Sequence, residues 1–443
     1  MNRTASTPGG PATAPRVSFF THGCRLNQHD TAAMRERALT AGLAEVPQGA
    51  VADVIVVNTC TVTARADREA RQLLRGLVRA HPAARIVVTG CYAQRAPGEI
   101  RAIPGVSAVL GIGERDDAKA LVGALVGASR AAAATSVGSA RGLREFRTEA
   151  ALHFGRTRAL LKIQDGCDSF CSYCIVPYVR GRSRSIPLEE AVDRARRLLA
   201  AGFHEIVLTG ADLGSYGKDL GDAGLLERLI HALLDLGDSH RLRISSIEPN
   251  KIHPSIVEMV GVEPRLCRHL HLPLQSGSDR VLQAMRRGYT RSQYAALLAK
   301  VVSRGTVGIG ADVIVGFPGE GDAEFEETYK FLEEAPVAFL HVFRYSARPG
   351  TTAARLDPPA DAVARERSER LRLLAETKGA AFRRALVGTT LPVIVEARQV
   401  AGRPVATSDV FVPVDLSRTP TTLGIVAARI LGLEGDRLIG EPA

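Results

Sequence analysis

The sequence contains no apolar run of the roughly 18 residues that a membrane-spanning helix needs. Its first stretch, MNRTASTPGGPATAPR, also lacks the apolar core of a secretory signal peptide, and its Pro, Gly, Ala and Thr residues predict a disordered tail over residues 1–15. We therefore expect a cytoplasmic protein with no membrane partner. Because cytoplasmic thiols stay reduced, the seven cysteines are expected to be metal ligands or catalytic groups rather than disulfides.

Length and charge set further limits. The 443 residues exceed the roughly 250–300 that one hydrophobic core supports, so two or three domains are expected. The hydrophobic fraction of 45% and the charged fraction of 23% are typical of soluble globular proteins. The formal charge of +10 favours a polyanionic partner, with nucleic acid as the obvious candidate. A generally basic, Arg-rich proteome is an equal alternative explanation of this charge.

Three segments in the first part of the chain share one pattern, a β-branched or aromatic run that stops at a cysteine. They are RVSFFTHGC (16–24), DVIVVNTC (53–60) and RIVVTGC (85–91). The segments between them have apolar residues at helical spacing, so the alternation predicts an α/β, Rossmann-like parallel sheet over residues 16–130. Ligands of such sheets lie beyond the carboxyl ends of the strands, so Cys24, Cys60 and Cys91 are expected to converge. Any one of them alone could equally be a small buried apolar residue.

After a linker predicted over residues 131–152, a second series of strand-like segments begins. They are RALLKIQDGC (158–167), EIVLTG (205–210), RLRISSIEP (241–249), HLHLPLQSG (269–277), GADVIVGFPGE (310–320) and FLHVFRYS (339–346). Helical segments separate them, and the alternation predicts a partial (β/α)6 parallel barrel over residues 153–384. Barrels of this kind carry their chemistry on the loops that follow the strands.

The loop after the first of these strands, GCDSFCSYC, contains Cys167, Cys171 and Cys174. A structural zinc site prefers four ligands, and this loop offers only three, so zinc is an incomplete alternative. A [4Fe–4S] cluster held by three thiolates leaves one iron open to a small molecule. The C-x3-C-x2-C spacing resembles that of radical S-adenosylmethionine (SAM) enzymes. The resemblance implies that the open iron binds SAM and that an electron from the cluster cleaves it to a deoxyadenosyl radical.

The same resemblance suggests which strand-end residues approach the cofactor. It places Thr209 and Gly210 near the methionine part of SAM, Ser246 and Glu248 near its ribose or amino group, Ile314 and Gly316 near the adenine, and Gln275 at the mouth of the barrel. Each residue could instead be an ordinary strand end followed by a turn, which is the commoner use of such residues.

The whole chain after the tail resembles the methylthiotransferase family of radical SAM enzymes. The motifs that carry the resemblance include GCRLNQHD, NTCTVT, TGCYAQ, ISSIEP and HVFRYSARPGT. The resemblance implies that Cys24, Cys60 and Cys91 hold a second [4Fe–4S] cluster, whose open iron carries the sulfur to be inserted. It also implies that a second SAM donates the methyl group and that the clusters and SAM carry the chemistry, with no catalytic side chain.

The motifs are most similar to the branch that acts on transfer RNA bearing N6-threonylcarbamoyladenosine at position 37, next to the anticodon. The implied product is the 2-methylthio derivative, and the implied partners are the tRNA anticodon loop, an electron donor such as flavodoxin or ferredoxin, and a sulfur source. The Arg-rich loop with Arg180, Arg182 and Arg184 could contact the threonylcarbamoyl carboxylate or RNA phosphates. Three alternatives stay open: an enzyme for isopentenyladenosine tRNA, an enzyme for a ribosomal protein aspartate, and a zinc-containing RNA-binding protein.

The last segment, residues 385–443, alternates short apolar strands with turns and predicts a small β-barrel. It resembles the TRAM RNA-binding domain of the same family. The preceding basic segment, ARERSERLRLLAETKGAAFRRAL, predicts a helix that either contacts RNA or is simply solvated. Cys267 has no cysteine nearby in the sequence and is expected to pack as an apolar residue.

Overall fold

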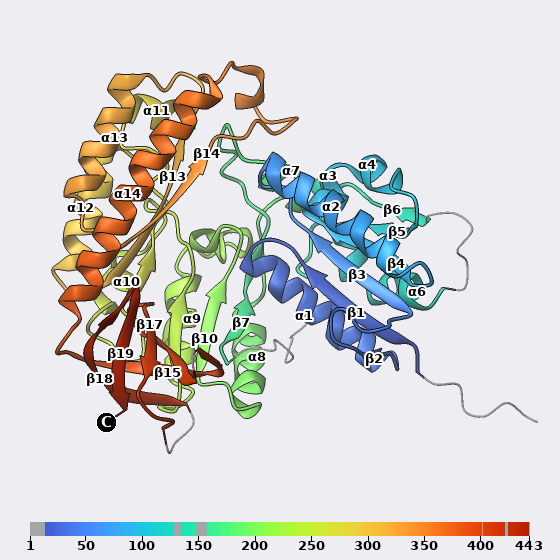
Figure 1. Ribbon diagram of the computed structural model, residues 1–443, viewed down its shortest axis with the longest axis horizontal. Coiled ribbons are helices and arrows are strands. Elements are labelled where there is room, and N and C mark those ends of the chain that lie inside the picture. Colours follow the sequence, from blue (N-terminus) through green and yellow to red (C-terminus); the bar gives the residue numbers. More distant parts are fainter. Residues whose placement is uncertain (1–13, 128–133, 148–156, 401, 421–423, 443) are drawn as a thin grey trace, which may run out of the picture. The chain divides into compact units, whose positions relative to one another are not determined.

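The computed structural model describes residues 14–127, 134–147, 157–400, 402–420 and 424–442 (Figure 1). The predicted tail falls almost entirely outside these segments, as do both ends of the predicted linker. The chain divides into two compact units: Met1–Thr61 with Arg65–Ser139, and Val62–Ala64 with Ala140–Ala443. Among the helices that are described, none is long and apolar enough to cross a membrane.

The first unit is built on a parallel sheet with the strand order β2-β1-β3-β4-β5-β6. The strands are β1 (Arg16–Thr21), β2 (Ala44–Glu45), β3 (Val54–Thr59), β4 (Arg85–Gly90), β5 (Val106–Leu110) and β6 (Ala134–Ser136). The three strands predicted to end at a cysteine are β1, β3 and β4, and they are hydrogen-bonded neighbours. Strand β6 comes from within the segment predicted as a linker and pairs with β5.

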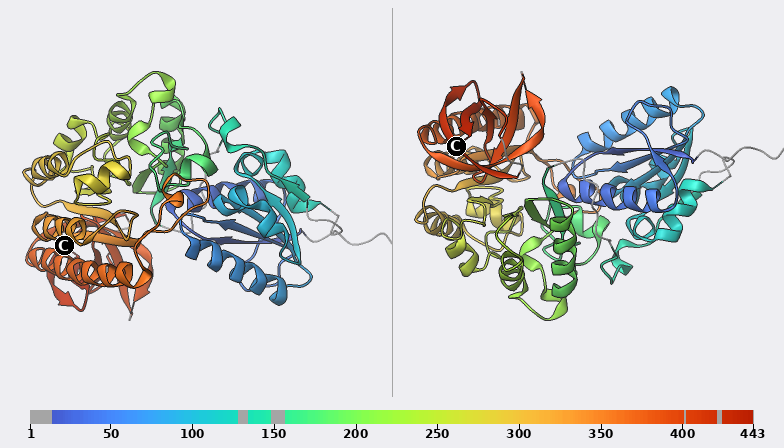
Figure 2. Two further views of the ribbon diagram at one scale, coloured as in Figure 1. Left: turned by 90° about the horizontal axis from the view of Figure 1, so that it is seen from above. Right: turned by 90° about the horizontal axis from the view of Figure 1, so that it is seen from below.

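Helices cover both faces of this sheet (Figure 2). They are α1 (Arg25–Thr40), α2 (Ala64–Ala80), α3 (Cys91–Arg95), α4 (Pro97–Arg101), α5 (Ile112–Asp116) and α6 (Ala118–Val126). Alternate residues of β3 belong to different cores: Ile55 packs in a cluster with Leu74 of α2, and Val56 packs in another with Met34 of α1. Burial on both faces explains why VIVV in β3 is a continuous apolar run rather than an alternating one.

The second unit begins with a partial barrel of six parallel strands, as predicted. In spatial order they are β7 (Ala159–Lys162), β10 (Glu205–Thr209), β11 (Arg241–Ile244), β12 (His269–His271), β13 (Gly308–Val315) and β14 (Phe339–Arg344). The strands form two three-stranded sheets, joined between β11 and β12 by single bridges such as Ser246 with His271. A short antiparallel pair, β8 (Gln164–Asp165) and β9 (Arg184–Ser185), flanks the cysteine loop.

Helices surround the barrel, and Figure 1 shows α12, α13 and α14 beside β13 and β14. They are α7 (Val176–Arg180), α8 (Leu188–Ala200), α9 (Leu225–Leu234), α10 (Pro254–Met259), α11 (Asp279–Ala284), α12 (Arg291–Val302), α13 (Asp322–Glu334) and α14 (Asp361–Ala385). Local signals set their ends. Helix α12 begins at a capping box made by Thr290 and Gln293, and α8 is followed by Gly202 with a left-handed φ of 87°.

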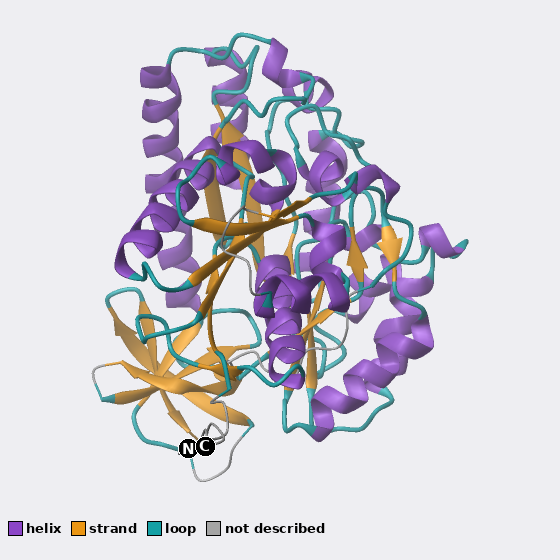
Figure 3. Cartoon of the chain, turned by 90° about the vertical axis from the view of Figure 1, so that its right-hand side faces the viewer, coloured by secondary structure: helices purple, strands orange, loops and turns teal. Residues whose placement is uncertain are grey.

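The C-terminal part of the second unit is a closed barrel with the order β15-β16-β17-β19-β18 (Figure 3). Its strands are β15 (Thr390–Val400), β16 (Arg403–Ser408), β17 (Pro413–Leu416), β18 (Ile425–Glu434) and β19 (Arg437–Pro442). Buried arginines join it to the larger barrel. Arg241 and Arg243 both bond the carboxylate of Glu205, and they donate to the carbonyl oxygens of Thr407 and Ser408 at 2.9 Å. The predicted α/β fold with a small C-terminal β-barrel is confirmed.

Candidate functional site

The first candidate site lies at the carboxyl ends of β1, β3 and β4. Cys24 is the N-cap of α1, Cys60 follows β3 directly, and Cys91 is the first residue of α3. Gly23 shows how closely the first two loops approach each other. It has a φ of 115°, and a Cβ added there would lie 2.7 Å from the Cβ of Cys60 and 3.1 Å from its Sγ. Only glycine fits this turn, so the β1 loop passes directly against Cys60.

The third loop is equally close to the second. Gly90, with a φ of 97°, has no room for a Cβ because the backbone of Thr59 lies against it. The side-chain amide of Asn27 donates to the carbonyl oxygen of Thr59 at 3.1 Å, and that of Asn58 donates to the carbonyl oxygen of Asn27 at 2.9 Å. Both asparagines are fully buried. The structure thus fixes the three cysteine loops against one another, with one exposed thiol, Cys24, and two buried ones.

The second candidate site is the loop that follows β8, with Cys167, Cys171 and Cys174. Main-chain hydrogen bonds fix its course: the amide of Cys167 donates to the carbonyl of Gly181, and that of Cys174 donates to the carbonyl of Cys171. Phe170, in the middle of the loop, has a left-handed φ of 45°. A bulky residue rarely adopts this conformation, and strain of this kind is found mostly at functional sites.

Burial favours the neutral form of two thiols of this loop. Burial raises the pKa of Cys167 to about 12, and burial also raises the pKa of Cys174 strongly. Without a metal these groups would be neutral thiols at pH 7, whereas a bound iron ion would stabilise the thiolates. The main-chain N–H of Ser169 lies 3.4 Å from the Sγ of Cys167, which is a contact of the kind that tunes cluster ligands. The donor set therefore fits an iron–sulfur cluster.

A polar pocket of about 460 Å³ adjoins this loop, and Cys171, Glu248, Lys251 and Arg287 are among the residues that line it. An Nη1 of Arg287 lies 3.4 Å from the Sγ of Cys171, and its other nitrogen forms an ion pair with Glu248. The Nζ of Lys251 contacts the Oδ2 of Asp212 at 2.5 Å. Burial raises the pKa of Glu248, although Arg287 opposes this effect. The pocket presents a carboxylate and two cations beside the cysteine loop.

The sequence motifs did not predict Lys251 and Arg287 as site residues. Lys251 comes shortly after ISSIEP, in the loop that follows β11, whereas Arg287 lies in AMRRGYT, between helices α11 and α12. A basic residue in a loop at the carboxyl end of a barrel strand is the signal that could have found Lys251, but it does not apply to Arg287. Their partners, Glu248 and Asp212, come from loops after two different strands. No pattern along the sequence predicts that Arg287 pairs with Glu248 or that Lys251 pairs with Asp212.

The other predicted cofactor residues do not share one pocket. Gln275 and Ile314 line a second pocket of about 180 Å³, together with Tyr173 and Asp312. Gln275 has a left-handed φ of 70°, and its main chain accepts a hydrogen bond from Ile314 N at 2.9 Å. Neither pocket is lined by Thr209, Gly210, Ser246 or Gly316 among its described residues.

Local packing explains two of these glycines. A Cβ at Gly210 would lie 2.8 Å from the Oε1 of Gln164, an atom that accepts a hydrogen bond from the amide of Asp212. A Cβ at Gly316 would lie 2.7 Å from the Cβ of Ala364 in α14. Both positions thus need glycine for close approach inside the barrel unit, whatever the cofactor.

Two of the three arginines in the Arg-rich loop do not have the substrate-contacting role that was hypothesised for them. Arg180 is buried and bonds Asp165 at 2.9 Å, while buried Arg184 donates to the carbonyl oxygens of Arg180 and Arg182. Arg182 is exposed and bonds Asp168 at 2.5 Å. Two of the three arginines therefore stabilise the segment that follows the cysteine loop, and only Arg182 has a side chain available to a substrate.

Two family models match the chain. The Radical SAM superfamily matches residues 161–332, and the Uncharacterized protein family UPF0004 matches residues 16–111. Among curated proteins, the chain is 40% identical to "Threonylcarbamoyladenosine tRNA methylthiotransferase MtaB" of Bacillus subtilis, over 86% of this chain and 84% of the relative. It is 38% identical to the protein of the same name from Aquifex aeolicus, over 82% and 87% of the two chains.

A relative with a different name is also similar. The "tRNA-2-methylthio-N(6)-dimethylallyladenosine synthase" of Novosphingobium aromaticivorans is 35% identical over 90% of each chain. Among solved structures, the radical SAM methyltransferase TsrM of Kitasatospora setae has a TM-score of 0.54 at 16% identity and covers 77% of each chain. This last similarity concerns the fold alone.

Proposed function

The chain belongs to the radical SAM methylthiotransferase family, and we propose that it converts N6-threonylcarbamoyladenosine at position 37 of tRNA to the 2-methylthio derivative. The observation that carries the substrate assignment is the 40% identity to the Bacillus subtilis relative named for threonylcarbamoyladenosine, against 35% to the dimethylallyladenosine synthase of Novosphingobium aromaticivorans. A tRNA substrate implies a cytoplasmic enzyme and agrees with the formal charge of +10.

Family membership implies a [4Fe–4S] cluster and SAM, and we assign them to Cys167, Cys171 and Cys174 and to the adjoining barrel mouth. When bound, the cluster supplies the electron that cleaves SAM reductively, which gives access to the unactivated C2–H bond of adenine. Arg287 and Lys251 place positive charge beside the cysteine loop, and each is also paired with a carboxylate, Arg287 with Glu248 and Lys251 with Asp212. Glu248 and Lys251 are complementary to the ammonium and carboxylate groups of an amino acid such as the methionine part of SAM.

We assign a second [4Fe–4S] cluster to Cys24, Cys60 and Cys91. The support is the convergence of their three loops and the match of this unit to a family model of its own. Anaerobic reconstitution with iron and sulfide should give a brown protein with about eight irons per chain. Stoichiometric zinc without broad visible absorption would instead indicate a zinc-containing RNA-binding protein.

We further propose that the C-terminal barrel binds the tRNA and that the anticodon loop delivers a splayed-out adenosine to the barrel mouth. The joint between Arg241, Arg243 and the carbonyls of β16 supports this, because it holds the small barrel rigidly against the catalytic one. A reductant of the flavodoxin or ferredoxin type and a sulfur source complete the reaction.

The test is mass spectrometry of tRNA nucleosides from a strain that lacks the gene. Complementation with the wild-type gene should restore 2-methylthio-N6-threonylcarbamoyladenosine. Cys171→Ala should fail to restore it, whereas Cys267→Ala, at a buried cysteine outside both trios, should succeed. Restoration of only the isopentenyl (dimethylallyl) derivative, or of a modified ribosomal protein and no tRNA product, would overturn the substrate assignment.

A further inference from the structure

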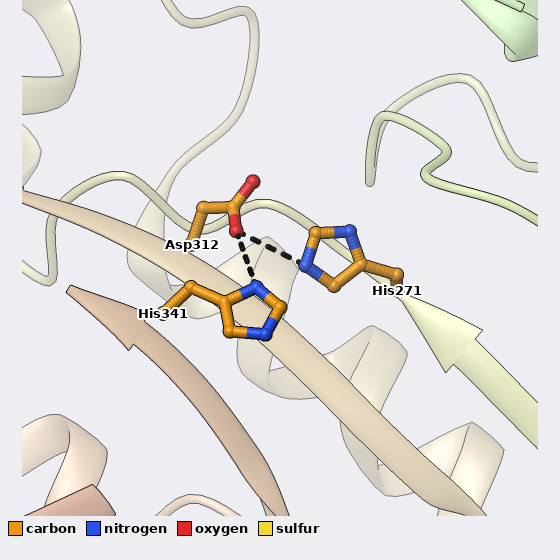
Figure 4. A group of neighbouring side chains, drawn as sticks. All are labelled: His271, Asp312 and His341. Atoms are coloured by element: carbon orange, nitrogen blue, oxygen red, sulfur yellow. Dashed lines mark hydrogen bonds and ion pairs between the residues drawn. The ribbon is translucent and has the colours of Figure 1, made fainter. Parts of the chain in front are cut away.

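Three side chains from neighbouring strands meet inside the barrel unit, and no cysteine is among them: His271 of β12, Asp312 of β13 and His341 of β14 (Figure 4). The register of the parallel strands brings them together. Asp312 pairs directly with His341, and His271 pairs with Gly310, two residues before Asp312 and therefore on the same face of β13. The sheet itself thus sets the arrangement, rather than a flexible loop.

The ligand atoms of the three residues all lie within 4.8 Å of one another, and the Nδ1 of His341 forms a hydrogen bond with the Oδ1 of Asp312. The Oδ1 of Asp312 lies 3.1 Å from the Nε2 of His271 and 3.1 Å from the Nδ1 of His341. Metal–ligand bonds of about 2.0–2.1 Å at tetrahedral angles place neighbouring ligand atoms about 3.3 Å apart. The Nε2 of His271 is buried, and despite the short distance it forms no hydrogen bond with any described residue.

Space and charge also favour an ion. Gly310 leaves room for the His271 ring, because a Cβ there would lie 2.7 Å from the ring's Cδ2. The carboxylate of Asp312 supplies an anionic oxygen ligand, and the two histidines supply imidazole nitrogens. The side chains of His271 and Asp312 are 16% and 22% exposed, while that of His341 is 58% exposed, which leaves a path for an ion to enter.

We propose that His271, Asp312 and His341 form a binding site for a divalent transition metal ion, with Zn²⁺ as its occupant. Two imidazoles and one carboxylate suit zinc or ferrous iron far better than calcium or magnesium, which prefer oxygen ligands. Three protein ligands leave at least one coordination position open to water or to an oxygen anion. Asp312 also lines the 180 Å³ pocket with Gln275 and Ile314, so the open position borders the predicted cofactor region. None of its three ligands is a cysteine of either trio.

The experiment titrates the full-length enzyme, with its clusters already reconstituted, with Zn²⁺ in competition with a chromophoric chelator. Wild-type protein should take up one tight equivalent of zinc per chain. Asp312→Asn and His341→Gln should weaken that equivalent at least about 100-fold, since loss of even an outer-shell partner typically costs about 10–100-fold. His253→Gln is the matched control, because His253 is a half-exposed histidine that pairs with a single carboxylate, Glu227, outside the cluster.

X-ray absorption at the zinc edge identifies the ligands. Nitrogen and oxygen at about 2.0–2.1 Å are expected, whereas zinc captured by a cysteine trio would show sulfur at about 2.3 Å. Iron and sulfide content, measured on the same samples, confirms that each variant is folded and loaded. Because His341 is exposed, His341→Gln should keep the wild-type fold even if a substitution at Asp312 does not. Equal zinc affinity in wild type and His341→Gln, or a sulfur shell in the wild type, would overturn the proposal and leave a metal-free cluster in which two histidines flank an aspartate.

Discussion

The two cysteine trios are built in opposite ways. Cys167, Cys171 and Cys174 lie in one loop, whose course is set by local main-chain hydrogen bonds and by the left-handed Phe170. Cys24 and its two partners come from three strands and are brought together only by the register of a parallel sheet. The loop trio is therefore a local property of the chain, and the sheet trio is a property of the folded first unit. Damage to either should be separable from damage to the other.

The largest expected effect is the separation of the two trios by single substitutions. Cys171→Ala removes a ligand beside Arg287 and should abolish reductive cleavage of SAM while about four irons per chain remain on the first unit. Cys60→Ala should do the reverse: deoxyadenosine still forms, but no methylthiolated product appears. Chromatography of deoxyadenosine and of modified nucleosides from the same reactions measures both outcomes. Normal product from Cys60→Ala would show that the sheet trio has no part in sulfur insertion.

A smaller but more specific effect is expected from Gly23→Ala, which leaves all six cysteines of the two trios in place. The added methyl group collides with Cys60 and sits at a φ of 115°, so the β1 loop must move away. We expect loss of most of the iron of the first unit and retention of SAM cleavage. Gly42→Ala is the matched control, because Gly42 also has a positive φ (85°) but has nothing within 4 Å. Full iron content in Gly23→Ala would mean that the first unit still holds its iron when the β1 loop is moved away from Cys60.

The same contrast explains what the sequence could predict. The apolar runs that end in Cys24, Cys60 and Cys91 are visible in the sequence. A strand buried on both faces is continuously apolar, and the cysteine marks the place where each run stops. The spacing of the loop trio is visible for a different reason, since all its ligands are within one short segment. The barrel and the C-terminal closed sheet follow from alternation and turn signals in the same way.

Contacts between distant strands could not be predicted. The pairing of Arg287 with Glu248 depends on how two barrel loops approach each other, and the meeting of His271, Asp312 and His341 depends on strand register. Arg180 and Arg184 show the opposite case, in which the sequence suggested a role that the structure does not support. Their charge suggested a surface role, although both are buried against Asp165 and nearby carbonyls. Residue type indicates the available chemistry, but burial decides whether a substrate can reach it.

The two units can also be compared in stability, at the strand ends that lie opposite to the cysteines. In the barrel unit, Glu205 begins β10, is fully buried and bonds two buried arginines, Arg241 and Arg243. Glu205→Gln leaves both guanidiniums without a counter-charge and should lower the free energy of unfolding by about 3–5 kcal/mol. Burial raises the pKa of Glu205, but the arginines outweigh it and lower the pKa to about 2. Its stabilisation is therefore present above the unfolded-state value of about 4.3 and is lost as the pH falls through about 2.

Urea unfolding of the barrel unit, followed at pH 7 and at pH 3, measures this difference. The gap between wild type and Glu205→Gln should be largest at pH 7 and should narrow at pH 3. A gap that is equal at both pH values would show that lost packing, and not the charge, causes the change.

The smallest effect is expected at the equivalent place in the first unit, where Asp53 precedes β3 and pairs with Arg16 at the start of β1. The two side chains are 50% and 45% exposed, and the carboxylate also accepts the main-chain N–H of Arg16 at 2.7 Å. That N–H is the main reason that the pKa of Asp53 is lowered, so its contribution is present above about pH 4 and is lost at lower pH. Asp53→Asn retains an oxygen acceptor and should cost less than about 1 kcal/mol, because exposed ion pairs are screened by water and salt. Urea unfolding at low and high salt checks this: a loss as large as that of Glu205→Gln would show that the edge of the first sheet depends on charge as strongly as the barrel does.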